Sequence, residues 1–204
     1  MTDKFKNKYR TKSIRLQNWD YRWSSSYFIT IITQKRCHFF GNNPKDEMNL
    51  SEIGKLANDY WIEIPKHFPF IELGAYVIMP NHMHGIITIN NMDTLHSQKP
   101  ITTIQPNVID FLKQGKASIS NNPEIEGIDK SSKMSNISPK QGSISTIIRS
   151  YKSIVTKSAR KINSSFGWQA RFHDNIIRNK KAYYKIENYI INNPKKWNND
   201  KFNG

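Results

Sequence analysis

The chain has 204 residues, one cysteine and a formal net charge of +15. This length suits one domain with a sizeable core, and the lone cysteine excludes an internal disulfide and suits a reducing compartment. No apolar run approaches the roughly 18 residues that a membrane span needs. The basic N-terminus also lacks the apolar segment of a secretory signal. We therefore expect a soluble cytoplasmic protein without a membrane partner.

The positive charge is concentrated towards both ends of the chain. Residues 1–36 carry a net +7 and residues 141–204 a net +10, whereas residues 37–140 carry a net −2. Charge gathered in two regions favours binding of a polyanion. Nonspecific basicity, as in ribosomal proteins, and simple basic tails are the alternatives. A nucleic acid is the favoured partner, which would associate the protein with the nucleoid.

The first half of the chain contains four segments with the periodicity of regular structure: a strand at 24–36, a helix at 50–68, and strands at 70–79 and 82–90. Ser51 is a suitable N-cap for the helix, and Pro65 is expected to end it. Pro80-Asn81 lies between the two later strands and is typical of a tight turn. These strands are therefore predicted to form an antiparallel hairpin.

The second half begins with a change of character. Residues 91–142 are rich in Ser, Asn, Pro and Lys and show no sustained period, which predicts a long irregular insertion. A short helix at 108–113 is possible within it. Beyond the insertion the pattern predicts a helix at 143–162, a strand-like segment within 166–178 and a last helix at 180–192.

The order of strand, helix, hairpin, helix and strand is that of a ferredoxin-like α+β sandwich. We expect an antiparallel sheet with helices packed on one face, the irregular insertion and a C-terminal helix. Residues 1–20 are interpreted as a basic N-terminal arm, and residues 21–200 as a single catalytic domain.

Two histidines, His82 and His84, stand one residue apart in the run AYVIMPNHMHGIITIN. Alternate side chains of a strand share a face, so the two imidazoles could bind one metal ion. Neutral imidazole suits several divalent metals, and Mg or Mn when substrate phosphate oxygens complete the shell. Two ordinary polar residues on an exposed sheet face are the alternative for this pair alone.

Tyr151 lies near the middle of an apolar stripe on the predicted helix at 143–162. It is either a core tyrosine packed on the sheet or a hydroxyl that faces the two histidines. In the second case it could attack a phosphodiester polarised by the metal. Its usual pKa of about 10 means that lysines or the metal would have to help it ionise.

Three blocks together resemble the single-tyrosine HUH transposases, and most closely the REP-associated tyrosine transposases: YVIMPNHMHGIITI, SISTIIRSYKSIVTK and FGWQARFHDNIIRNKKAYYKIENYIINNPKKW. With the first strand they cover most of residues 20–200. The resemblance implies a ferredoxin-like fold and cleavage and transfer of single-stranded DNA at hairpins, dependent on Mg or Mn. It also implies that His82 and His84 bind the metal and that Tyr151 retains the 5′ phosphate. Relatives of this kind act as monomers or homodimers.

One position departs from the pattern of this family. Insertion-sequence members often carry a metal-binding Gln one turn after the tyrosine, where this chain has Val155. His173 and Asp174 are the candidates for a third ligand, although a DNA contact or a structural role would also suit them. The basic residues expected to contact DNA phosphates are Arg149, Lys152, Lys157, Arg160, Lys161, Arg171 and Arg178. Trp23, Trp168 and Phe172 could stack on bases, but large aromatic residues more often belong to the core.

Two other classes of function stay open at this level. One is a protein that binds structured single-stranded DNA or RNA without cleaving it. The other is a metal phosphohydrolase without covalent chemistry, which would need further ligands, and His67 is the nearest candidate.

Overall fold

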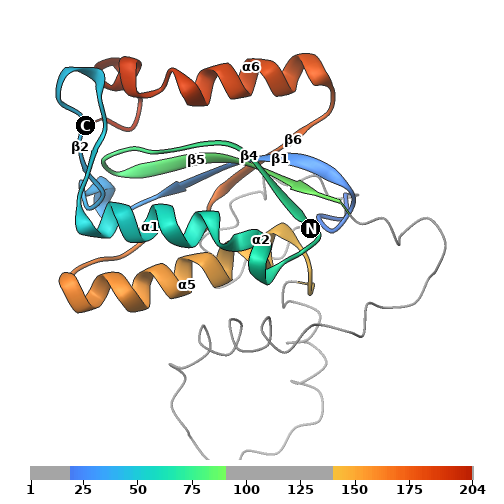
Figure 1. Cartoon of the computed structure of the whole chain (residues 1–204), viewed down its shortest axis with the longest axis horizontal. Helices are drawn as coiled ribbons and strands as arrows, with labels where there is room; N and C mark the ends of the chain where they lie inside the picture. The colour runs from blue at the N-terminus through green and yellow to red at the C-terminus, as the bar shows by residue number, and fades with distance from the viewer. Residues whose placement is uncertain (1–18, 91–139, 204) are drawn as a thin grey trace, which may run out of the picture.

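The computed structural model describes residues 19–90 and 140–203 (Figure 1). Nearly all of the predicted N-terminal arm at 1–20, and of the insertion at 91–142 with its possible helix, lies outside the described residues. Among the described residues, no helix is both long enough and apolar enough to cross a membrane.

Four strands form one antiparallel sheet in the order β4-β5-β1-β6. They are β1 (Ser25–Ile32), β4 (Ile71–Ile78), β5 (His82–Ile89) and β6 (His173–Ile177). Helix α1 (Glu52–Ile62) joins β1 to β4, and α5 (Ile144–Ile162) precedes β6. This succession and strand order are those of the ferredoxin-like fold. The predicted α+β class and the antiparallel hairpin of β4 and β5 are confirmed.

The start of α1 follows from its capping residue. The Ser51 hydroxyl accepts a hydrogen bond from the backbone N–H of Gly54 at 3.0 Å, which satisfies one of the free donors of the first turn. Helix α1 ends at Ile62, before Pro65. The proline instead lies in the first turn of the short helix α2 (Ile64–His67), where its missing N–H costs little.

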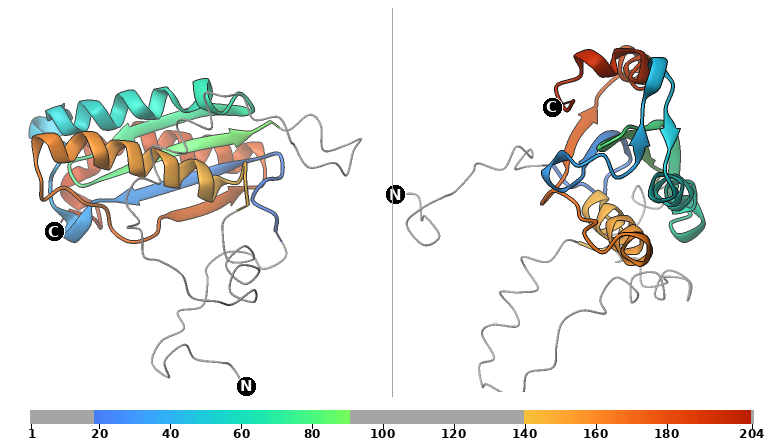
Figure 2. Two further views of the ribbon diagram at one scale, coloured as in Figure 1. Left: turned by 90° about the horizontal axis from the view of Figure 1, so that it is seen from below. Right: turned by 90° about the vertical axis from the view of Figure 1, so that its left-hand side faces the viewer.

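Helices α1 and α5 cover one face of the sheet (Figure 2). Odd-numbered residues of β1 and β5, such as Ile29 and Met83, point into this larger core and are fully buried. Trp61 of α1 packs against β5 at Gly85, where an added Cβ would lie 2.4 Å from the indole ring. The absence of a side chain at Gly85 therefore makes room for the tryptophan.

Helix α6 (Lys180–Ile191) covers the opposite face of the sheet (Figures 1 and 2). Even-numbered residues of β5 point this way, and Ile86 packs with Ile177 and Ile190 in a second, smaller core. The prediction of helices on one face thus holds for α1 and α5, while the C-terminal helix adds a third layer. The sheet therefore has two covered faces with different partners.

Several short elements gather at the end of the sheet where β1 ends and β5 begins. They are η2 (Gln34–Arg36), β2 (Gly41–Asn42), η3 (Pro44–Asp46), β3 (Asn49–Leu50) and η5 (Pro194–Asn199). The side-chain amide of Asn43 donates to the Pro194 carbonyl at 2.6 Å, which ties η3 to η5. The side-chain amide of Asn81 donates to the Phe202 carbonyl at 2.7 Å, which holds the chain after η5 beside the start of β5.

Candidate active site

The two histidines of the H-x-H pair lie side by side on the α6 face of β5. His82 is fully buried and His84 is 2% exposed, and their ring centroids are 4.7 Å apart. Strand alternation gives them this common face, as expected from the sequence. Buried rings in contact must be held by defined partners, because an unpaired buried polar atom is costly.

Asn81 fixes the ring of His82. Its side-chain N–H₂ donates to the Phe202 carbonyl at 2.7 Å, so its oxygen is the atom that faces Nδ1 of His82 at 2.9 Å. Because an amide oxygen only accepts, Nδ1 carries the hydrogen and Nε2 keeps its lone pair. Nε2 is buried and has no hydrogen-bond partner among the described residues. An unpartnered imidazole lone pair of this kind is suited to a cation.

His84 is held from both of its nitrogens. Nδ1 lies 2.8 Å from the Thr30 hydroxyl on β1, and Nε2 lies 3.2 Å from the Tyr189 hydroxyl on α6. If the phenol donates to Nε2, Nδ1 carries the hydrogen and donates to Thr30. Both histidines then carry their lone pair on Nε2, which has no partner among the described residues in His82 and accepts from Tyr189 in His84.

A third candidate ligand, a carboxylate oxygen, is offered by Asp200, which follows η5. One ligand atom from each of His82, His84 and Asp200 lies within 4.8 Å of the others. The Asp200 carboxylate is oriented by the backbone N–H of Phe202 at 2.7 Å and by the amide of Asn193 at 3.3 Å. Two imidazoles and one carboxylate are a donor set that fits a divalent metal ion.

The predicted third ligands, His173 and Asp174, are not part of this group. Both lie on β6, which is separated from β5 by β1. Asp200 was not a candidate on sequence grounds, because it belongs to a segment without strand or helix periodicity.

Burial and nearby cations keep the histidines neutral. Burial, with smaller contributions from the charges of Lys201 and Arg36, lowers the pKa of His82 to about 3. Burial and the neighbouring His82 also lower the pKa of His84 well below its usual value. Neutral imidazole is the form that binds metals, so this pair is ready to bind a cation at neutral pH.

Tyr151 lies on the other side of the sheet from the histidines, and the prediction that its hydroxyl faces them is wrong. It is fully buried between α5 and α1, its hydroxyl donates to the Ala57 carbonyl at 2.9 Å, and its ring contacts Trp61. Burial raises its pKa well above the usual value. Tyr151 is thus the core tyrosine that the sequence left open as the alternative.

Tyr189 on α6 occupies the position that the sequence interpretation gave to Tyr151. Its ring lies 5.2 Å from that of His84, and 36% of its surface stays exposed. Burial, followed by the negative charge of Asp200, raises its pKa. Tyr189 was not among the candidate site residues that the sequence singled out. The signal that could have found it is its position one helical turn before Asn193-Pro194, within the third of the blocks that resemble the transposases.

Comparison with known proteins finds a relative of similar length. A Haemophilus influenzae protein of uncharacterised function is 32% identical over 190 residues, which span 93% of this chain and 91% of that protein. The chain belongs to the same family as this protein. No family model matches the sequence.

Two solved structures are also similar to this fold. A REP-associated tyrosine transposase bound to a REP hairpin is 18% identical, with a TM-score of 0.45, over 96% of this chain and 74% of that chain. A candidate transposase from Deinococcus radiodurans is 10% identical, with a TM-score of 0.39, over 88% of this chain and 97% of that chain. Both of those proteins are described as transposases.

The residues predicted to contact DNA lie mainly on or near α5. Lys152 is held by the chain itself, because its ammonium donates to the carbonyls of Gln169 at 2.9 Å and Arg171 at 2.8 Å. Burial lowers its pKa to about 8. The other predicted basic residues are exposed: Arg149, Lys157, Arg160, Lys161, Arg171 and Arg178. Helix α5 covers the sheet face opposite to the histidines. The basic residues on α5 are therefore remote from the candidate site.

The predicted stacking residues divide between surface and core. Trp23 is 47% exposed, whereas Trp168 packs against the main core and its indole N–H donates to the Lys152 carbonyl at 3.1 Å. Phe172 also packs against that core. Trp168 and Phe172 are therefore structural in this arrangement.

Proposed function

We propose that this protein is a transposase-like, metal-dependent endonuclease and strand transferase of single-stranded DNA in which Tyr189 forms a covalent 5′-phosphotyrosine. The observation that carries the proposal is the 3.2 Å contact between the Tyr189 hydroxyl and Nε2 of His84. It brings together one nucleophile and one metal ligand in a buried group of neutral imidazoles. The resemblance of the sequence blocks to HUH transposases supports the same chemistry.

His82, His84 and Asp200 would hold the metal, Mg or Mn. The buried lone pair on Nε2 of His82 and the convergence of the three donor groups fit such an ion. When bound, a divalent cation would polarise the scissile phosphate as a Lewis acid. The hydrogen bond between the Tyr189 hydroxyl and Nε2 of His84 has to break when Nε2 becomes a metal ligand. The Tyr189 hydroxyl is then free to turn towards a phosphate.

In the proposed reaction the phenolic oxygen of Tyr189 loses its proton and attacks phosphorus. An O–P bond forms to the tyrosine, the bond from phosphorus to the 3′ oxygen breaks, and that oxygen takes up a proton as a 3′ hydroxyl. Strand transfer is the reverse step with another 3′ hydroxyl. Because Asp200 raises the pKa of Tyr189, neutralisation of this carboxylate by a bound cation would favour the phenolate.

The proposed substrate is single-stranded DNA that carries a hairpin. Positive charge in both terminal regions of the sequence supports a polyanionic substrate. Tyr189 and both histidines of the candidate site come from one chain, which is compatible with a monomer as well as a homodimer. We also propose that residues 21–200 act as one catalytic domain of a nucleoid-associated protein.

A protein that binds structured single-stranded DNA without cleaving it is the second candidate. The observation that favours it is the burial of both histidines, with the Phe202 ring 4.7 Å from His82. In this arrangement the Phe202 ring packs against His82. A protein whose histidines stay covered in the DNA complex would bind DNA and leave it intact.

The test is formation of a covalent adduct with labelled DNA hairpins taken from the flanks of the gene, incubated with Mg or Mn. An SDS-resistant adduct is expected with wild type and with Tyr151→Phe, and none with Tyr189→Phe or His82→Ala. Tyr151→Phe is the matched control, since it removes one phenolic hydroxyl on the other face of the sheet. Salt-sensitive binding without any adduct would favour the second candidate.

A further inference from the structure

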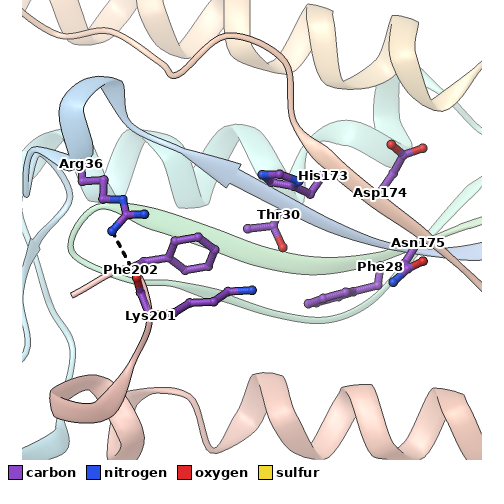
Figure 3. A pocket seen from close by; sticks show the side chains of 8 residues that line it. All are labelled: Phe28, Thr30, Arg36, His173, Asp174, Asn175, Lys201 and Phe202. Carbon is purple, nitrogen blue, oxygen red and sulfur yellow. Dashed lines mark hydrogen bonds between the residues drawn. The ribbon is translucent and has the colours of Figure 1, made fainter. Parts of the chain in front are cut away.

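A pocket of about 370 Å³ opens between β1, β6 and the segment that follows η5 (Figure 3). It adjoins the histidine pair through three of its lining residues. Phe28 stacks on His84 with ring centroids 5.2 Å apart, Thr30 is hydrogen-bonded to the same histidine, and Phe202 lies 4.7 Å from His82. A group held in this pocket would therefore lie next to the proposed scissile phosphate.

The edge strand β6 supplies polar groups to the pocket. His173 pairs with Thr30 and Asn175 pairs with Phe28 in the antiparallel register, so both side chains lie on the same sheet face as the pocket (Figure 3). Both residues are exposed. An amide that both donates and accepts can pair with the edge of a nucleobase, and aromatic rings nearby provide a stacking surface.

Two cations border the same pocket beside the ring of Phe202. The ammonium of Lys201 lies 4.8 Å from the ring centroid and the guanidinium carbon of Arg36 lies 5.8 Å from it. Arg36 also donates to the Lys201 carbonyl at 3.1 Å, which ties η2 to the segment after η5. Cations at the rim of an aromatic pocket are suited to the phosphate of a nucleotide whose base lies inside.

We propose that this pocket binds the nucleotide adjoining the scissile phosphate and that Asn175 reads its base. The inference deepens the proposed function and rests on it for the position of the scissile bond. The base would lie against Phe28 and Phe202, its edge would face β6, and its phosphate would face Arg36 and Lys201. The protein would then select its cleavage site partly by direct contact with one unpaired base.

The test uses a DNA hairpin with a randomised single-stranded arm as the probe. Tyr189→Phe protein, which cannot form the adduct, is allowed to bind the pool in the presence of Mg, and the bound sequences are read. We expect selection of one base at one position of the arm. Adding Asn175→Ala should reduce that selection about tenfold, the typical loss when a paired base edge is left without its partner. Asn90→Ala is the matched control, because Asn90 is exposed at the far end of β5 and contacts Glu72.

The outcomes separate this inference from the proposed function. Base selection that is lost with Asn175→Ala supports the pocket, whether or not wild type forms an adduct. Absence of selection, or selection unchanged by Asn175→Ala, overturns the pocket even if wild-type protein cleaves the hairpin. An adduct assay on the selected sequence then tests the nuclease by itself.

Discussion

Tyr189 and Tyr151 lie on opposite faces of the same sheet, and only Tyr189 contacts a histidine of the H-x-H pair. Both tyrosines sit on helices that pack against β5 or its neighbours. Their hydroxyls nevertheless have different partners, because one donates into the core at Ala57 and the other reaches Nε2 of His84. This difference decides which tyrosine can carry covalent chemistry at the proposed metal site.

Asn81 should control the metal affinity of the site although it is not itself proposed as a ligand. Replacing it with alanine removes the acceptor that fixes Nδ1–H of His82 and the donor to the Phe202 carbonyl. Loss of such a partner behind a histidine ligand typically lowers metal affinity by roughly 10- to 100-fold. Calorimetric titration with Mn should show this loss for Asn81→Ala and little change for Asn90→Ala. Equal affinities would contradict the orienting role.

Substitutions at Asp200 and Asp174 test which of the two residues is the third metal ligand. The Asp200→Asn change keeps an oxygen that can accept from Phe202 N–H but removes the anionic ligand. We expect about a tenfold or greater loss of Mn affinity for Asp200→Asn, and unchanged affinity for Asp174→Asn on β6. The reverse result would restore the ligand predicted from the sequence and remove Asp200 from the site.

The sequence predicted the topology of the sheet better than the site that it carries. Periodicity alone identified β4, β5, α1 and α5, because alternation and a helical stripe follow directly from which side chains are buried. It could not assign a face to the histidines. β5 is apolar on both sides, with Met83 and Ile87 towards one helix layer and Ile86 towards the other. A strand that is covered on both faces has no polar side from which a solvent-exposed face can be identified.

The stripe on α5 explains why Tyr151 was a plausible nucleophile from sequence. The apolar character of the stripe correctly indicated that α5 packs on the sheet. Which of the two sheet faces a helix covers depends on the tertiary arrangement, and the stripe does not indicate it. Asp200 was beyond prediction for a different reason. It comes after the last helix, where η5 and the following turn are set by contacts such as that of Asn43 with the Pro194 carbonyl.

Stability of the metal-free protein should fall as the pH is lowered below about 6.5. The pKa of His82 is lowered to about 3 in the folded state, whereas the unfolded chain takes up a proton near its ordinary value of about 6.5. The unfolded state therefore binds more protons between these values, and acid favours unfolding. The loss is at most about 1.4 kcal/mol per pH unit for this residue.

Urea denaturation in the presence of a chelator measures this dependence. The free energy of unfolding should decline between pH 6.5 and pH 4.5 in wild type, and decline less steeply in His82→Leu. A wild-type curve that is flat over this range would show that His82 is not held neutral by burial.

Lys201 and Lys157 test which surface the DNA follows. Lys201 borders the pocket beside the histidines, whereas Lys157 lies exposed on α5, which covers the other face of the sheet. The logarithm of the binding constant falls linearly with the logarithm of the salt concentration. Removing a lysine that neutralises one phosphate should reduce the steepness of this line by about one unit. We therefore expect Lys201→Ala to weaken hairpin binding and reduce this slope, and Lys157→Ala to change neither. Fluorescence anisotropy over a series of salt concentrations distinguishes the two. A reduced slope for Lys157→Ala alone would place the DNA on α5, as the sequence interpretation had it.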